Sequence, residues 1–167
     1  MTGFACSTCG QWHDELPMCF GPSAPDLWFQ LPEHERAARA ELTSDQCVID
    51  GKHFFVLGRI VLPVVDAPGE TFVWLAWVSL SEATFARACE LWQAPGRESE
   101  PAYFGWLQNE LPYPSSTLNL KTNVRTMPVG ERPEIELQAS DHPLAREQRE
   151  GVTLARVREI AEAALHG

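Results

Sequence analysis

The segment from Phe4 to Gly10 holds residues whose types and spacing suit metal binding. Two residues separate Cys6 from Cys9, and Gly10 follows the second cysteine directly. Thiolates are ligands that Zn²⁺ prefers, and this spacing lets both sulfurs reach one tetrahedral ion. Glycine tolerates a left-handed backbone, so the turn after Cys9 can tighten. The sequence therefore predicts a zinc knuckle within residues 4–20.

A closed tetrahedral zinc site needs two further ligands. His13 lies four residues after Cys9 and can reach the same ion by local looping. We favour Cys47 as the distant fourth ligand, because zinc ribbons commonly join a knuckle to a β-hairpin. Cys19 is a weaker alternative. The predicted cofactor is thus a structural Zn²⁺ held by Cys6, Cys9, His13 and Cys47.

His53 competes with Cys47 for the fourth position, and the turn between them decides which is favoured. The Asp50-Gly51 dipeptide is typical of a tight hairpin turn. A two-residue turn would point Cys47 and His53 to opposite faces, because side chains alternate along a strand. A three-residue loop would return both to one face. We expect the two-residue turn, which favours Cys47.

A carboxylate stands beside an imidazole in Asp141-His142-Pro143, and general base catalysis often uses these two groups. Adjacent residues rarely orient each other as a dyad, and Asp141 is well placed to cap a short helix over residues 143–148. The sequence has no G-x-S-x-G elbow, glycine-rich phosphate loop or H-E-x-x-H motif. We therefore predict no catalytic residue.

Size and charge narrow the classes of protein further. With 167 residues, of which 44% are apolar, the chain suits a single domain with its own core over residues 1–167. The formal net charge of −10 disfavours nucleic acid as a partner. No apolar run approaches the ~18 residues of a membrane span, and no secretory signal is visible. We expect a cytoplasmic protein whose five cysteines are reduced thiols.

Hydrophobic periodicity predicts an α+β fold, an antiparallel sheet with helices packed on it. The sheet core with one helix spans residues 46–138, and C-terminal helices span 141–166. The expected helices cover 32–42, 80–93, 143–148 and 154–166, the last capped by Thr153; the expected strands cover 47–49, 53–62, 71–80, 117–125 and 134–138.

Four details of these elements can be checked individually. Residues 71–80 are apolar on both faces and should form the central strand. A capping box of Ser79 and Glu82 should start the helix over 80–93, whose stripe of Phe85, Ala88, Cys89 and Trp92 should face the sheet. The preceding strand should bend or bulge near Gly58. Residues 103–107, Tyr-Phe-Gly-Trp-Leu, are assigned to the core in preference to a pocket or partner groove.

Several segments in order give the chain its likeness to a known family. They are residues 4–10 with His13, 47–50, 53–56, 77–81, 103–107, 117–121 and 141–145 with Glu147 and Gln148. In these segments the chain resembles a bacterial family, Domain of Unknown Function 2199, from Phe4 to about His166. Leu57 departs from the pattern, in which arginine precedes the glycine. The resemblance implies a bacterial origin and no particular reaction.

Together these features predict a binding protein with a structural zinc, a protein–protein interaction module. Its acidic character suits a basic partner, such as a toxin that it neutralises. The alternative is a zinc-dependent hydrolase, in which Cys6, Cys9 and one further ligand leave a metal position open for water.

Overall fold

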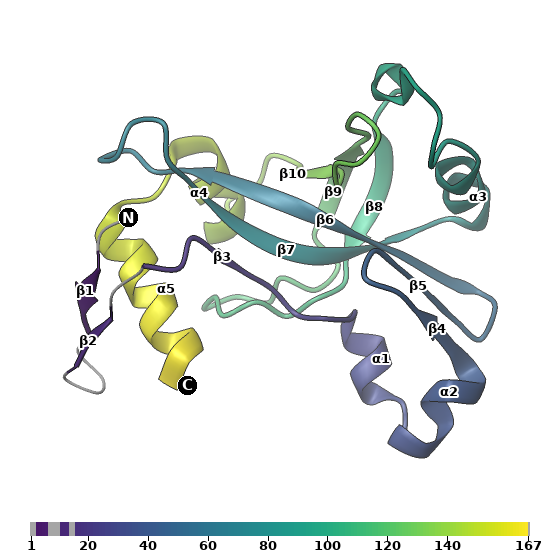
Figure 1. Cartoon of the computed structure of the whole chain (residues 1–167), viewed down its shortest axis with the longest axis horizontal. Helices are drawn as coiled ribbons and strands as arrows, with labels where there is room; N and C mark the ends of the chain where they lie inside the picture. The colour runs from purple at the N-terminus through teal and green to yellow at the C-terminus, as the bar shows by residue number, and fades with distance from the viewer. Residues whose placement is uncertain (1–2, 7–10, 14–15, 167) are drawn as a thin grey trace.

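The computed structural model describes residues 3–6, 11–13 and 16–166 (Figure 1). Its strands are β1 (Phe4–Ala5), β2 (Trp12–His13), β3 (Cys19–Phe20), β4 (Ala40–Leu42), β5 (Gln46–Ile49), β6 (His53–Pro63), β7 (Thr71–Leu80), β8 (Tyr103–Leu107), β9 (Lys121–Arg125) and β10 (Glu134–Leu137). Its helices are α1 (Asp26–Gln30), α2 (Arg36–Arg39), α3 (Glu82–Glu90), α4 (Pro143–Glu150) and α5 (Leu154–His166), with short 3₁₀ turns at Glu33–Glu35 and Arg97–Ser99.

Strands β6 to β10 close into a five-stranded barrel. Each pairs antiparallel with the next, and β10 returns to pair parallel with β6, where Glu134 lies opposite Arg59. The α+β class is confirmed, but the sheet is not the purely antiparallel one expected. Strand β3 also pairs parallel with β7, and β5 and β4 extend the sheet beyond β6.

Gly58 allows the barrel to close. A Cβ at this position would lie 2.7 Å from the side chain of Ile135 on β10, so only glycine lets β10 approach β6 so closely. The predicted bulge is wrong, because β6 and β7 pair one to one through Gly58 and Ala76.

Strand β7 is buried on both faces, as its sequence predicted. One face, with Phe72, Trp74 and Val78, belongs to the core cluster inside the barrel. The other face carries Trp77, which packs outside the barrel with Leu31 and other apolar side chains of a second cluster. The continuous apolar run of β7 is therefore explained by two cores, one on each side of the strand.

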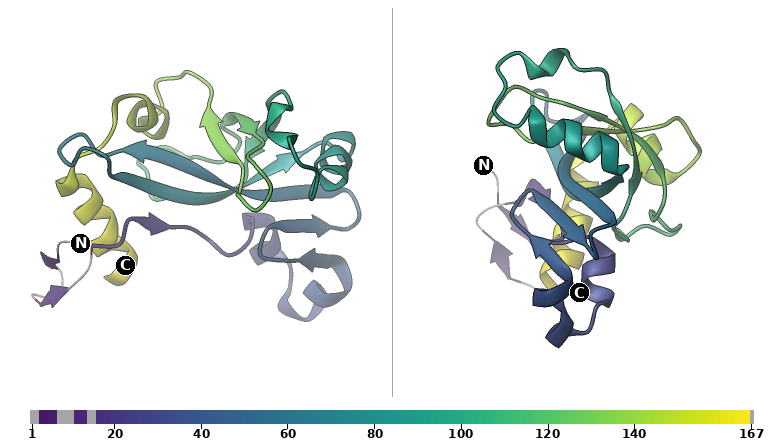
Figure 2. Two further views of the ribbon diagram at one scale, coloured as in Figure 1. Left: turned by 45° about the horizontal axis from the view of Figure 1, so that its top comes forward. Right: turned by 90° about the vertical axis from the view of Figure 1, so that its right-hand side faces the viewer.

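The N-terminal hairpin and the β4–β5 hairpin lie at opposite ends of the molecule. Figures 1 and 2 show β1 and β2 beside α5 at one end, and β4, β5 and α2 at the other. Phe4 of β1 belongs to the barrel cluster together with Val157 and Ile160 of α5, so this hairpin is anchored to the core.

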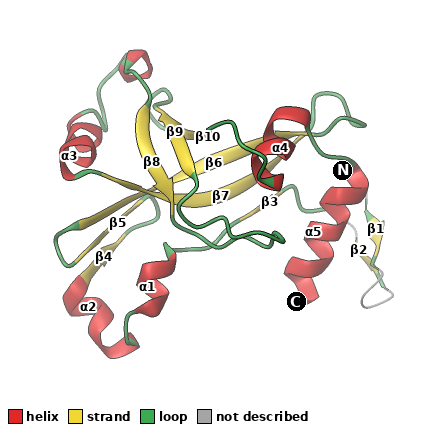
Figure 3. Cartoon of the chain, turned by 180° about the vertical axis from the view of Figure 1, so that it is seen from behind, coloured by secondary structure: helices red, strands yellow, loops and turns green. Residues whose placement is uncertain are grey.

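Helices α3 and α4 cover opposite ends of the barrel (Figure 3). Helix α3 begins after β7 ends at Leu80, and its N-cap is Ser81, whose hydroxyl accepts a bond from the N–H of Thr84. The predicted cap at Ser79 is wrong, because that residue still pairs within β7. Of the predicted apolar stripe, Phe85 is buried but Cys89 is exposed.

Local backbone also differs from expectation in two other segments. The helix expected over residues 32–42 is divided into a 3₁₀ turn, the single turn of α2 and strand β4. The strand expected over 117–125 is shortened to β9, because Asn119 adopts a positive φ of 64° that ends extended structure. Among the helices that the structure describes, none is long and apolar enough to cross a membrane.

Candidate functional site

The N-terminal hairpin places two of the predicted zinc ligands on one face. Phe4 pairs with His13 across the strands, so their side chains share a face, and their rings stack at 5.0 Å. Cys6 lies two residues beyond Phe4 and is buried on that same face. The N–H of Cys6 donates to the carbonyl of Gln11 at 2.9 Å, which holds the base of the C-x-x-C loop.

The remaining residues of the knuckle, including Cys9, lie outside the described residues. Within the part of the chain that the structure describes, no group of three or more His, Cys, Asp or Glu side chains is arranged to hold a metal ion. The hairpin therefore supplies Cys6 and His13 as neighbours on one face, and its full donor set depends on Cys9 as well.

Cys47 is not brought together with the hairpin. It is fully buried in the second cluster, with Ile49, Phe55 and Trp77. It lies on β5, and β5 is at the opposite end of the molecule from the N-terminal hairpin (Figure 1). Burial raises the pKa of its thiol to about 11, so it is a protonated, apolar side chain there. The exposed Cys19 lies on β3, next to Val73 of β7.

The turn before His53 has three residues, so the expected two-residue turn is wrong. Ile49 pairs with His53, and Cys47 pairs with Phe55. Cys47 and His53 consequently share a face, but Cys47 is buried whereas His53 is exposed.

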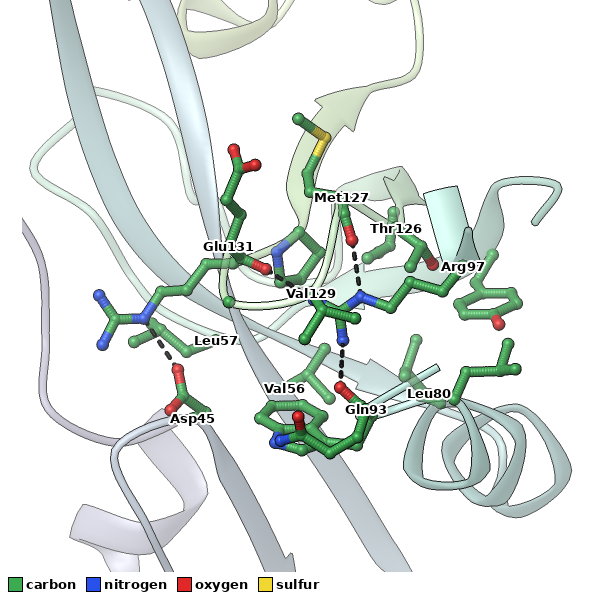
Figure 4. A pocket seen from close by; sticks show the side chains of 18 residues that line it. Asp45, Val56, Leu57, Leu80, Gln93, Arg97, Thr126, Met127, Val129 and Glu131 are labelled. Carbon is green, nitrogen blue, oxygen red and sulfur yellow. Dashed lines mark hydrogen bonds and ion pairs between the residues drawn. The ribbon is translucent and has the colours of Figure 1, made fainter. Parts of the chain in front are cut away.

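A cavity of about 310 Å³ lies between α3 and the adjacent end of the barrel (Figure 4). Its walls are largely apolar and come from β6, β7, α3, β9 and the loop after β9; they include Val56, Leu80, Leu91, Val124 and Val129. This volume is at the lower end of the ~300–1,000 Å³ typical of small-molecule sites.

Arg97 brings a positive charge to this apolar cavity. It is only 9% exposed, and its guanidinium donates to the carbonyls of Trp92, Met127, Pro128 and Glu131 at 2.7–3.1 Å. None of the carboxylates in the described residues lies within ion-pair distance of it. The charge is therefore balanced by carbonyl dipoles and by the ring of Trp92, whose centroid lies 5.8 Å from the guanidinium carbon, an uncommon arrangement for a buried cation.

Two interactions border the cavity. Arg132 forms an ion pair with Asp45 at 2.9 Å, which joins the loop after β9 to the start of β5. Tyr103 donates from its hydroxyl to Glu100 at 2.9 Å, and Glu100 also pairs with Arg87 of α3. These contacts join four different parts of the sequence beside the cavity.

Residues 103–107 do not all belong to the core, contrary to the sequence-based assignment. Gly105 and Leu107 are buried, but Phe104 and Trp106 are 44% and 40% exposed and stack edge to face. Trp106 lines a second, more open hollow of about 570 Å³, whose other walls include Asp26, Gln30, His53, Gln108 and Asn119. Exposed aromatic side chains beside polar groups are typical of interaction surfaces.

Asp141 does not cap α4. His142 occupies the N-cap position, and its Nδ1 accepts a bond from the N–H of Leu144 at 3.0 Å. Since Nδ1 accepts, Nε2 carries the proton and donates to the carbonyls of Ser115 and Ser116. Both ring nitrogens of His142 are thus engaged in hydrogen bonds with the backbone.

Glu147 and Gln148 attach α4 to the barrel. Glu147 accepts from the hydroxyl of Tyr113 and from Nε of Arg156 at 2.8 Å. Gln148 pairs through its amide with the backbone of Ile135 and Leu137 on β10, as a neighbouring strand would. The motif over 141–148 therefore has a structural explanation.

Sequence reasoning did not identify Arg97 or the cavity. Pro95 and Gly96 before Arg97 indicate only the end of a helix, and the carbonyl partners of Arg97 at 127–131 lie about thirty residues away. Such a site has no local signature in the sequence.

Comparison with known proteins identifies one family. Residues 5–152 match the family described as "Uncharacterized protein conserved in bacteria (DUF2199)". The searches of curated proteins and of solved structures found no match.

Proposed function

This chain belongs to the bacterial family DUF2199, and we propose that it is a non-catalytic binding protein whose N-terminal hairpin holds a structural zinc ion. Cys6, Cys9 and His13 are the ligands on the hairpin. The observation that carries the proposal is the pairing of Phe4 with His13, because it puts Cys6 and His13 on one face at the base of a C-x-x-C loop.

The fourth ligand is assigned to a carboxylate of Asp14 or Glu15, which follow His13 directly in the sequence. Zinc accepts Asp and Glu oxygens as well as Cys and His. Cys47 would have to leave its apolar cluster to take this position, at the cost of a buried cavity.

The decisive measurement is elemental analysis of the purified chain and of three cysteine variants. We expect about one zinc per chain, little zinc in Cys6→Ser, and unchanged zinc in Cys47→Ser and in the exposed control Cys89→Ser. Zinc-free wild-type protein from a zinc-replete expression would refute the proposal. Loss of zinc in Cys47→Ser alone would instead return the fourth position to Cys47.

A structural zinc should affect stability more than activity. Phe4 and Cys6 are the hairpin's members of one core cluster, but most residues of the two clusters beside β7 come from the barrel and the helices. Chelation should therefore lower the Tm and expose the hairpin without unfolding the barrel. Thermal melts with and without chelator test this, beside a screen for hydrolase activity.

The zinc-dependent hydrolase is the second candidate, and one observation favours it. Because Cys47 lies in the other cluster, the local ligands alone would leave a metal position for water if neither carboxylate binds. Metal-dependent turnover with an unchanged Tm would establish this candidate, whereas a lowered Tm without turnover would establish the structural ion.

For the bound partner we propose a basic protein, of which a toxin is one example. The formal net charge of −10 on this chain favours a partner with a basic surface. Phe104 and Trp106 offer exposed aromatic anchors beside the open hollow. A tagged chain returned to its host should retain a basic protein at low salt and release it at high salt. Trp106→Ser should lose this protein while Trp12→Ser, altered at the remote hairpin, should keep it; recovery of only acidic proteins would contradict the proposal.

A further inference from the structure

We propose that the cavity beneath α3 is a binding site for a small amphipathic anion, an apolar chain or ring that ends in a carboxylate. This site is separate from the zinc hairpin and from the exposed aromatic side chains of β8, so it adds a second binding activity to the fold. Three properties of the cavity support the assignment: its size, its apolar walls and a buried guanidinium that no carboxylate of the described residues pairs with.

Size and walls define the apolar part of the ligand. The volume of about 310 Å³ suits a molecule of modest size. Side chains of the barrel and of α3 line it, with Leu80 and Val124 on the barrel side and Leu91 on the helical side. An apolar ligand in this space would remove both its own apolar surface and that of these side chains from water, which favours binding.

Arg97 defines the charged end of the ligand. A guanidinium has five N–H donors, and the four bonds to carbonyls leave Nη1, which can donate twice, with one hydrogen bond in the described part of the chain. A carboxylate would accept the remaining donor and supply the negative charge that the carbonyl dipoles only approximate. A ligand cation would meet the same guanidinium with repulsion.

The geometry also holds Arg97 ready for a ligand. Its four carbonyl partners come from two segments, Trp92 and the loop over 127–131, so the guanidinium cannot rotate without breaking several bonds. Figure 4 shows the guanidinium of Arg97 beside Val129. A fixed donor loses little entropy when a ligand binds.

The test is calorimetric titration with two probes of equal chain length and opposite charge, octanoate and octylammonium. We expect octanoate to bind to the intact chain at least about tenfold more tightly, a difference of about 1.4 kcal/mol. Equal affinity for both probes, or no heat from octanoate at millimolar concentration, would overturn the proposal.

Two substitutions on α3 locate the binding. Ala88 lines the cavity, whereas Ala86 on the same helix is exposed. Ala88→Phe fills the cavity and should weaken octanoate binding at least about tenfold, while Ala86→Phe should leave it unchanged. Wild-type affinity in Ala88→Phe, or equal losses in both variants, would place the binding elsewhere and refute the site.

A third variant tests the role of the charge. Arg97→Gln should abolish the preference for octanoate over octylammonium, provided that its thermal melt shows a folded protein. If this variant does not fold, the Ala88→Phe and Ala86→Phe pair together with the two probes still decides the question. A folded Arg97→Gln that keeps the full preference would refute the assignment of Arg97.

Discussion

The two ends of the barrel contain similar residues but satisfy them in different ways. At the end covered by α4, a tyrosine, a carboxylate and an arginine form one connected network: Trp74 donates to Tyr113, Tyr113 donates to Glu147, and Arg156 pairs with Glu147. At the end covered by α3, Arg97 contacts carbonyl groups and the ring of Trp92 but no carboxylate in the described residues, and a cavity remains beside it.

The two ends of the barrel have different roles, although one strand contacts the helices at both of them. Strand β6 contacts both helices, so the same sheet supports a filled end and a hollow end. A buried network whose members are all hydrogen-bonded fixes one conformation. A buried cation without a carboxylate partner lowers the stability of the fold, so its presence beside an apolar cavity is better explained by ligand binding. The α4 end therefore holds the fold together, and the α3 end is the part available to a ligand.

The largest expected effect comes from breaking the filled end. Glu147→Leu leaves the hydroxyl of Tyr113 and the guanidinium of Arg156 without their shared acceptor. We expect a loss of about 3 kcal/mol in the free energy of unfolding, measured by urea denaturation. Glu159 also faces Arg156, at 3.5 Å, but is exposed; Glu159→Gln should cost less than about 0.5 kcal/mol. Similar costs for both variants would show that the network is no more than a surface ion pair.

A smaller effect is expected at the hollow end. Arg97→Lys keeps the charge but replaces the planar donor group by an ammonium that cannot reach four carbonyls in two segments. We expect a loss of about 2 kcal/mol, and less than about 0.5 kcal/mol for Arg125→Lys on the surface of β9. A loss at Arg97 that exceeds the loss in Glu147→Leu would reverse the assignment of the two ends.

Much of the fold was predictable because its signals are local. The alternation in 134–138, the apolar run of 71–80 and the amphipathic stripe of 154–166 all correspond to elements of the structure. The closure of the barrel was not predictable in this way. It depends on the short parallel pairing of Glu134 with Arg59, between segments 75 positions apart in the sequence, and on the contact that Gly58 permits.

The candidate site residues show the same difference between local signals and contacts that join distant segments. Cys6 and His13 could be grouped from spacing alone, and the hairpin places them on one face. The placement of Cys47 depended on the register of a distant hairpin and on which core cluster it joins, and spacing gives neither. The cap of α4 could have been assigned correctly, because Pro143 at the first helical position makes the preceding residue, His142, the N-cap.

The N-caps of α3 and α4 provide a control for the comparison of the two ends, because each should contribute equally to the free energy of unfolding. His142→Ala at α4 and Ser81→Ala at α3 each remove a side-chain acceptor for a backbone N–H. We expect each to lower the free energy of unfolding by about 1 kcal/mol. Asp141→Ala should cost less than about 0.5 kcal/mol, because Asp141 is exposed and His142 already caps the helix. Urea denaturation of the three variants distinguishes the observed caps from the expected one.

The smallest expected effect concerns the two tyrosines of the chain, one at each end of the barrel. Burial has the larger effect on the pKa of both phenols and raises it. The hydrogen bond that each phenol donates to a carboxylate, Tyr113 to Glu147 and Tyr103 to Glu100, raises it further. The rise in pKa is larger for Tyr113, which lies in the filled end.

These raised pKa values fix the sign of an alkaline effect on stability. Above the unfolded pKa of about 10, the unfolded chain releases a phenolic proton that the folded chain retains, so rising pH favours unfolding. The contribution is fully present below that pH and falls as the pH rises towards the folded pKa. The free energy of unfolding should therefore decrease between about pH 9 and pH 11. Tyr113→Phe should reduce this slope more than Tyr103→Phe, and tyrosinate absorbance should show Tyr103 ionising first. The opposite order would mean that the end beneath α3 is the drier one, and the distinction between a filled and a hollow end would fail.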